Sequence, residues 1–429
     1  MMNTFVCKLF DSDSFHVKGA TVVNLNDNNQ YNYTFWNLSK KLYCIPYSFT
    51  KEALDLFYIS LMVFYADRSV LRSLQSDGWT RHIEVYMPVL NVGRWNANSA
   101  LLKEMLDFLT GDDWTFHFRD RICITDDEDK YKKCKHHFRN STQKIDTNVF
   151  CMLSGGLDSF IGAIDLLSSN VNPIFVGNYN GGKGVSVYQN RVIDSLQKHF
   201  KIAPERFYQF YAAPKSGKED TTRSRSLLFF SHAILLASGM NKPVKLYIPE
   251  NGVISMNIPL TEHRMGSLST RTTHPYFMGL LQELLKSLDL KITIVNPYQF
   301  KTKGEMMLEC KDLEFLKSNY PLTMSCSHPD LGRWKKEKES SHCGVCLPCT
   351  IRRAAILKAG LNDKSFYRDP NYNDIEAETN LRSYKLGLTR KKNPLFAIQE
   401  SGPITQHRKE FADLYQRGLA ELKGFIDTL

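Results

Sequence analysis

The sequence lacks any long apolar segment. No run of about 18 or more apolar residues occurs among its 429 residues, and a membrane-spanning helix needs that length. Residues 1–16 include Asp11 and Asp13 at a place where a secretory signal peptide would need an apolar stretch. We therefore expect no membrane partner, no secretory signal and a cytoplasmic protein.

Two further absences narrow the class of protein. The Walker pattern Gly-x-x-x-x-Gly-Lys-Ser/Thr does not occur, so any phosphate-binding loop must be of another kind. No internal repeat or low-complexity segment stands out, and 42% of the residues are hydrophobic, which supports a globular core. The net charge of +10 favours acidic partners such as nucleotides or nucleic acid, but it carries no information about the fold.

A glycine turn between an apolar run and a helical pattern is the strongest local signal. Residues 148–153 are apolar and partly β-branched, as in a buried strand, and residues 160–167 have the apolar spacing of a helix. Adjacent glycines let the backbone approach a bulky anion, and the N–H groups of the new helix point toward it. The expected phosphate-binding residues are Ser154, Gly155, Gly156, Leu157, Asp158 and Ser159.

This Ser-Gly-Gly-x-Asp-Ser motif, at a strand-to-helix turn, resembles the PP-loop of ATP pyrophosphatases. Those enzymes split ATP between its α and β phosphates and activate a carboxylate or carbonyl as an adenylate. The resemblance implies ATP binding. The alternative interpretation is an ordinary glycine turn in a parallel sheet.

Strand and helix patterns alternate regularly after the loop. Strands are expected at 173–179, 207–213, 245–250 and 291–298, and helices at 185–200, 225–240 and 274–288. This rhythm predicts a doubly wound parallel sheet, which binds ligands at the carboxyl ends of its strands. We therefore expect the loops at Ser154 and after Tyr179, Ala213 and Glu250 to face one crevice.

Three basic residues near that edge are candidate phosphate ligands. Lys183 lies in a glycine-rich turn, and Arg225 begins a helix, where a cation opposes the helix dipole. We expect both to bind ATP or substrate. Lys303, beyond the last strand, is expected to act near the departing pyrophosphate, together with Ser154 and Asp158 as catalytic residues. Solvent exposure is the alternative for each lysine.

Four of the ten cysteines cluster in the sequence, in a pattern that includes two overlapping C-x-x-C steps. The expected metal ligands are Cys326, Cys343, Cys346 and Cys349. Four thiolates match the closed tetrahedral site of structural zinc. His328 and His342 are rival ligands, and an iron–sulfur cluster is the alternative to zinc.

Two regions flank this central part. Residues 1–146 show mixed strand and helix patterns without a catalytic constellation, and they predict an accessory α/β domain that ends in a basic linker around His136-His137. Residues 147–360 are expected to form the ATP-binding domain with the Cys₄ site. Residues 361–429 predict a helical extension that ends in an amphipathic helix, whose apolar face we expect to be packed.

The loop and the cysteines together resemble the QueC-like PP-loop proteins, whose reference activity is 7-cyano-7-deazaguanine synthase. The likeness covers about residues 148–360. Residues 225–229 are similar to the family's Gly-Arg-Asn-Leu-Leu-Phe segment, with Ser226 in place of asparagine, and residues 301–305 are similar to its Thr-Lys-x-Glu element. Residues 249–259 depart from the Asp-Ser-Gly-Tyr-Pro-Asp stretch expected at the deazaguanine pocket.

The resemblance implies an α/β fold with a doubly wound parallel sheet, like that of adenine-nucleotide α-hydrolases, and ATP, Mg²⁺ and Zn²⁺ as cofactors. The implied reaction adenylates the carboxylate of 7-carboxy-7-deazaguanine and releases pyrophosphate. Ammonia then gives the amide, and a second ATP activates the amide for loss of water to the nitrile. The altered pocket and the added regions resemble enlarged QatC-like proteins of bacterial anti-phage (antiviral) operons, where an amine on a partner protein from the same operon could be the acceptor.

Two other classes of function stay open at this point. A PP-loop enzyme that modifies tRNA would also explain the positive charge, and it predicts salt-sensitive tRNA binding. A nucleotide-binding scaffold without catalysis would bind ATP but release no pyrophosphate.

Overall fold

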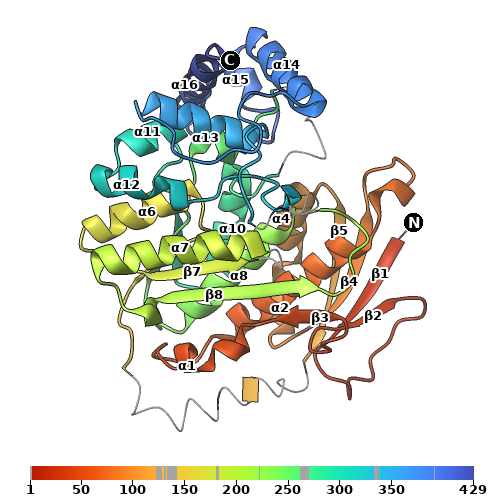
Figure 1. Cartoon of the computed structure of the whole chain (residues 1–429). Coiled ribbons are helices and arrows are strands. Elements are labelled where there is room, and N and C mark those ends of the chain that lie inside the picture. The colour runs from red at the N-terminus through yellow and green to blue at the C-terminus, as the bar shows by residue number, and fades with distance from the viewer. Residues whose placement is uncertain are drawn as a thin grey trace. The chain divides into compact units, whose positions relative to one another are not determined.

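The structure is a computed structural model that describes residues 2–121, 128–129, 132, 143–179, 183–221, 223–260, 270–332, 337, 339–390 and 392–429. The chain divides into two compact units, each made of several segments (Figure 1). Unit 1 comprises Met1–Phe150, Tyr208–Leu246 and Phe277–Ile294, and unit 2 comprises Cys151–Phe207, Tyr247–Tyr276 and Val295–Leu429. The division of the chain at residues 146 and 360 stays a prediction, and His136-His137 lies outside the described residues.

Unit 1 contains a four-stranded parallel sheet in the order β2-β1-β4-β5. Its strands are β1 (Met2–Lys8), β2 (Thr21–Asn24), β4 (His82–Val89) and β5 (Asp113–Asp120). Phe5 pairs with Thr21 on one side and with Val85 on the other, which fixes the register around the central strand β1. Other helices of unit 1 are α1 (Ser39–Leu42), α3 (Val92–Ala97), α4 (Ser99–Thr110) and α10 (Pro275–Ser287). The first two residues of α10, Pro275 and Tyr276, are assigned to unit 2.

Two apolar helices form the core of unit 1. Helix α2 (Lys51–Ser69) begins at its N-cap Thr50, whose hydroxyl accepts a hydrogen bond from Ala53 N, and it packs against α8 (Arg225–Ser238). The Ser60 and Ser231 hydroxyls lie 2.6 Å apart across this contact. Because 14 of the 19 residues of α2 are buried, the helix is a core element and not an amphipathic surface helix.

One expected strand is shorter than its pattern suggests. Residues 31–38 predict a strand, but β3 covers only Tyr31–Tyr33 and is followed by a 3₁₀ turn, Trp36–Leu38. Strand β3 pairs antiparallel with β8 (Phe207–Pro214). Phe35 and Trp36 are both buried, which a half-buried strand with alternating faces cannot accommodate, so the chain turns there.

The second sheet has six strands in the order β10-β9-β6-β7-β8-β3. Its further strands are β6 (Val149–Met152), β7 (Ile174–Tyr179), β9 (Val244–Tyr247) and β10 (Ile292–Val295). The chain runs outward from β6 through β7 to β8, and then resumes at β9 on the other side of β6. This is the strand order of doubly wound sheets, which bind ligands where the order reverses. The expected α/β class with parallel sheets is confirmed, and the PP-loop fold itself stays a prediction.

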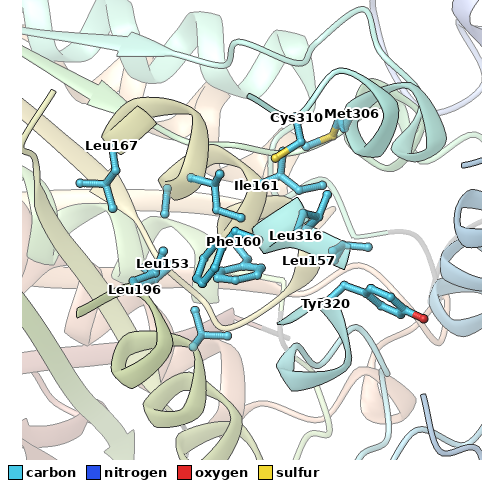
Figure 2. Packing of buried hydrophobic residues seen from close by; sticks show 14 of the residues in the cluster. Leu153, Leu157, Phe160, Ile161, Leu167, Leu196, Met306, Cys310, Leu316 and Tyr320 are labelled. Atoms are coloured by element: carbon cyan, nitrogen blue, oxygen red, sulfur yellow. The ribbon is translucent and has the colours of Figure 1, made fainter. Parts of the chain in front are cut away.

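Unit 2 is mainly helical. Its helices include α6 (Leu157–Ser168), α7 (Lys183–Phe200), α9 (Gly252–Met256), α11 (Lys303–Leu308), α12 (Leu313–Asn319), α13 (Leu347–Lys358), α14 (Ile375–Thr389), α15 (Pro394–Ala397) and α16 (Arg408–Ile426). Figure 2 shows Phe160 and Ile161 of α6 in one buried cluster with Met306 of α11 and Leu316 of α12. This packing fixes the start of α6 in unit 2.

Among the described residues, no helix combines the length and the apolar character that a membrane crossing requires.

Candidate functional site

The expected phosphate loop connects β6 to α6. Gly155 has φ +83°, a conformation that favours glycine, and a Cβ atom there would lie 3.0 Å from the Cα atom of Gln189. Gly156 is the N-cap of α6, and no side chain caps that end. The first N–H groups of this 12-residue helix are therefore not capped by its own N-cap residue, which is the geometry of an anion-binding turn.

Two serine hydroxyls hold the loop in shape. Ser159 Oγ accepts a hydrogen bond from Ser154 N at 3.2 Å and donates one to Gly156 O at 3.0 Å, and the two hydroxyl oxygens lie 3.1 Å apart. Gly156 N donates to Ser154 Oγ at 3.3 Å. Leu157 points into the buried cluster of unit 2, so its contribution to an anion is limited to the backbone (Figure 2).

Asp158 and Lys303, which are 145 residues apart in the sequence, form a buried ion pair. The Asp158 side chain is 11% exposed and the Lys303 side chain 7%. The other carboxylate oxygen of Asp158 accepts hydrogen bonds from Asn251 N at 3.1 Å and from Asn251 Nδ2 at 2.7 Å. Lys303 is the first residue of α11, after its N-cap Thr302, which forms a capping box with Glu305. The structure thus brings a lysine cation to the first turn of α6.

A second carboxyl group lies beside this pair. Glu250 follows β9 and accepts a hydrogen bond from the Thr273 hydroxyl, which is also 3.1 Å from Ser255 Oγ. The pKa of Glu250 is raised to about 7, chiefly because burial disfavours the charged carboxylate. The charge of Asp158 adds to this rise, whereas the hydrogen bond from Thr273 and the charge of Lys303 oppose it. Asn251 and Glu250 carry no motif that sequence reasoning could use. Their only signal is their place directly after a strand.

The structure does not test the other two basic candidates, Lys183 and Arg225. Lys183 is the first residue of α7, and its side chain lies outside the described residues. Arg225 begins α8, where its guanidinium carbon is 5.3 Å from the centroid of the Phe229 ring. Burial and the nearby Arg68 lower the pKa of Arg225. Phosphate binding by Lys183 and Arg225 stays a prediction.

The four clustered cysteines converge on one point. The sulfur atoms of Cys326, Cys343, Cys346 and Cys349 all lie within 4.8 Å of one another. The Cys326–Cys346 and Cys343–Cys349 pairs are each 3.9 Å apart, close to the edge of about 3.8 Å expected for a tetrahedron with Zn–S bonds of about 2.3 Å. Backbone N–H groups at Cys343 and Cys346 donate to these sulfurs at 3.3 Å. The donor set and its spacing fit a structural zinc ion.

His342 does not belong to that group of four. Its Nδ1 lies 3.8 Å from Cys349 Sγ, and its Nε2 lies 3.2 Å from Thr323 O, so the ring bridges the cluster and the segment before Cys326. His328 contributes its backbone N–H to Cys326 Sγ at 3.3 Å. Both histidines therefore lie next to the sulfur cluster, outside the set of converging ligand atoms.

The cysteine cluster and the phosphate loop are joined through one short segment. Met324 N donates a hydrogen bond to Gly155 O at 2.9 Å, two residues before Cys326. Arg352 of α13 is fully buried and donates to Thr323 Oγ1 at 2.7 Å and to Tyr320 O at 2.9 Å. A metal at the cysteines would thus fix the segment that supports the loop.

Comparison with known proteins finds a similarity over one segment of this chain. Residues 273–360 match the family model described as "Queuosine biosynthesis protein QueC". No match was found among curated proteins, and none among solved structures. The matched segment contains Lys303 and the four cysteines, while the loop 154–159 lies outside it. Over this segment the chain is similar to QueC, which supports a QueC-like, ATP-using protein.

Proposed function

We propose that the protein is an ATP-dependent ligase that adenylates a carboxylate of the 7-carboxy-7-deazaguanine type. The observation that carries the proposal is the buried Lys303–Asp158 pair at the uncapped first turn of α6. A lysine cation and a row of N–H groups beside one turn suit a polyphosphate. The similarity of residues 273–360 to QueC supports the substrate class.

In the proposed reaction, a carboxylate oxygen attacks the α-phosphorus of ATP, and the bond from that phosphorus to the bridging oxygen breaks. Gly155, Gly156 and the two loop hydroxyls bind the phosphates, and Lys303 stabilises the charge of the departing pyrophosphate. An amine nitrogen then attacks the acyl carbon, AMP leaves with the oxygen, and one N–H proton goes to a base. Magnesium would add charge neutralisation at the pyrophosphate when bound.

We extend the proposal to the acceptor. Ammonia would give the amide, which a second ATP would activate for loss of water to the nitrile. An amine on a partner protein would instead give a deazaguanine-modified protein, as in QatC-like anti-phage defence. The departure of residues 249–259 from the family pattern motivates the second possibility. Mass spectrometry of small molecules and of candidate partner proteins after the reaction distinguishes the two. Finding only the free nitrile, with no protein adduct, would argue against transfer to a protein.

The test is pyrophosphate release and ATP–pyrophosphate exchange with 7-carboxy-7-deazaguanine, with and without ammonium. We expect carboxylate-dependent exchange in the wild type and a loss of about 100-fold or more in Lys303→Gln, since a charge stabiliser is removed. Lys301→Gln is the matched control, because Lys301 lies two residues away and pairs with Glu309. Circular dichroism confirms that each variant is folded. Exchange that is absent from the folded wild type, or equal in the two variants, would contradict the proposal.

A further inference from the structure

The C-terminal helix α16 contacts the residues on both sides of Lys303. Glu421 Oε2 accepts a hydrogen bond from Thr302 Oγ1 at 2.5 Å, and Glu421 Oε1 accepts one from Gly304 N at 3.0 Å. One carboxylate thereby holds the residue before Lys303 and the residue after it. Burial and the charge of Glu305 raise the pKa of Glu421, because both disfavour the ionised carboxylate. The hydrogen bonds from Thr302 and Gly304 act in the opposite direction and stabilise the carboxylate.

A second side chain of α16 secures the same turn. Arg417 lies four residues before Glu421 and therefore on the same face of the helix. Its Nε donates to Glu305 Oε1 at 2.7 Å, and its Nη2 donates to Phe300 O at 2.8 Å. The contacts of Arg417 and Glu421 span residues 300–305, so α16 holds the whole segment that carries Lys303.

The fit between α16 and this segment is close. A Cβ atom at Gly304 would lie 2.6 Å from Glu421 Oε2 and 2.8 Å from Lys358 Cγ, so a larger residue there would force these two side chains to move. Helix α13 packs against both α11 and α16, and the three helices lie together in Figure 1. Lys303 and Glu421 also line one small cavity of about 40 Å³. Helix α16 is therefore part of the immediate surroundings of Lys303.

We propose that α16 is a working part of the candidate site and that Glu421 is a positioning residue, which directs the Lys303 side chain toward Asp158 by fixing Thr302 and Gly304. Residues 408–426 lie outside the segment that matches QueC, so the family similarity does not supply this role. The effect on catalysis rests on the proposed function. The effect on the position of the Lys303 side chain rests only on the contacts of Lys303 and its neighbours.

The experiment compares Glu421→Ala, Glu421→Gln and, as a control, Glu410→Gln, an exposed residue of the same helix that pairs with His407. Glutamine keeps the shape and can bond both neighbours, with its carbonyl to Gly304 N and its amide to the Thr302 hydroxyl. We expect the ATP–pyrophosphate exchange rate to fall about 10- to 100-fold in Glu421→Ala with little change in the KM for ATP. Glu421→Gln recovers most of the rate, and Glu410→Gln equals the wild type.

Three outcomes would overturn the inference: a folded Glu421→Ala variant with wild-type exchange, a Glu421→Gln variant as slow as the alanine variant, or a loss seen only in the KM. A second measurement is independent of the reaction. Lysine acylation followed by mass spectrometry reports the accessibility of Lys303, which we expect to be protected in the wild type and in Glu421→Gln and to be exposed in Glu421→Ala. If the wild type shows no exchange, the proposed function fails, and the acylation result still decides the role of Glu421.

Discussion

Glu250 is the residue whose ionisation is best suited to an experiment. Because the folded protein raises its pKa to about 7, the folded state binds this proton more tightly than the unfolded chain does. The resulting stabilisation is complete below about pH 4.5 and is lost as the pH rises through about 7.

We therefore expect Glu250→Gln, which cannot ionise, to melt at a higher temperature than the wild type at pH 8. The difference in the free energy of unfolding should reach at most about 3 kcal/mol and should vanish near pH 4. Thermal melts from pH 4 to pH 8 measure it. Glu314→Gln is the control, since that side chain is 84% exposed. A difference that is constant with pH would show that Glu250 ionises normally in the folded state.

Asp67 belongs to a buried network that joins three segments of unit 1. Its carboxylate pairs with Arg81 at 2.5 Å, both side chains being fully buried, and it accepts hydrogen bonds from Ser224 N at 3.1 Å and Ser224 Oγ at 2.6 Å. Arg81 also pairs with Asp112. The network fixes Ser224, the residue just before Arg225.

We expect Asp67→Asn to lower the free energy of unfolding by about 3–5 kcal/mol, because it removes one of the two carboxylate charges that pair with the buried guanidinium of Arg81. Urea denaturation measures the change. Asp220→Asn is the control. It removes the ion pair with Arg68, but because the Asp220 side chain is fully exposed, the free energy of unfolding should not change. Equal effects of the two substitutions would mean that Asp112 alone neutralises Arg81.

At the scale of elements, the cysteine cluster supports the phosphate loop through the hydrogen bond from Met324 N to Gly155 O. We expect chelation of the metal, or Cys349→Ser, to weaken ATP binding by about tenfold or more, since a structural metal stabilises the fold around it. Elemental analysis and calorimetric titration with ATP give the metal content and the affinity. Cys310→Ala, a buried cysteine outside the cluster, should keep the metal. Normal ATP affinity in metal-free protein would show that the loop is independent of the cluster.

Helix α16 shows why an amphipathic pattern alone is ambiguous. Its apolar residues return at helical intervals, and Phe411, Leu414 and Leu422 are buried within unit 2. The expectation of a packed face is therefore confirmed. The polar face of the same helix carries Arg417 and Glu421. No pattern in the sequence predicts their contacts with residues 300–305.

At the scale of the whole chain, the net charge of +10 raises the question of nucleic acid. Under the proposed function, pyrophosphate release requires a small carboxylate and no tRNA, so adding tRNA or ribonuclease should leave the rate unchanged. Filter binding with tRNA, measured at salt concentrations from about 50 to about 200 mM, should show only weak binding that is lost at the higher concentration. Saturable tRNA binding combined with tRNA-dependent pyrophosphate release would favour the tRNA-modifying alternative.

The sequence by itself determined those features of the protein that depend on residues close together in the chain. The serine–glycine loop, the four cysteines and the alternation of strands and helices are short-range patterns, and each depends on residues within a few turns of one another. They predicted the α/β class, the position of the loop and the convergence of the cysteines. The same alternation predicted a doubly wound parallel sheet, without a particular strand order.

Only the tertiary structure decided which distant residues share a site. Asp158 meets Lys303 across 145 residues, and Thr302 meets Glu421 across 119. The structure also added Asn251 and Glu250 beside Asp158. Such contacts depend on how helices pack after the sheet has formed. A single asparagine or glutamate in a loop has no sequence pattern that distinguishes a buried partner from a solvated side chain.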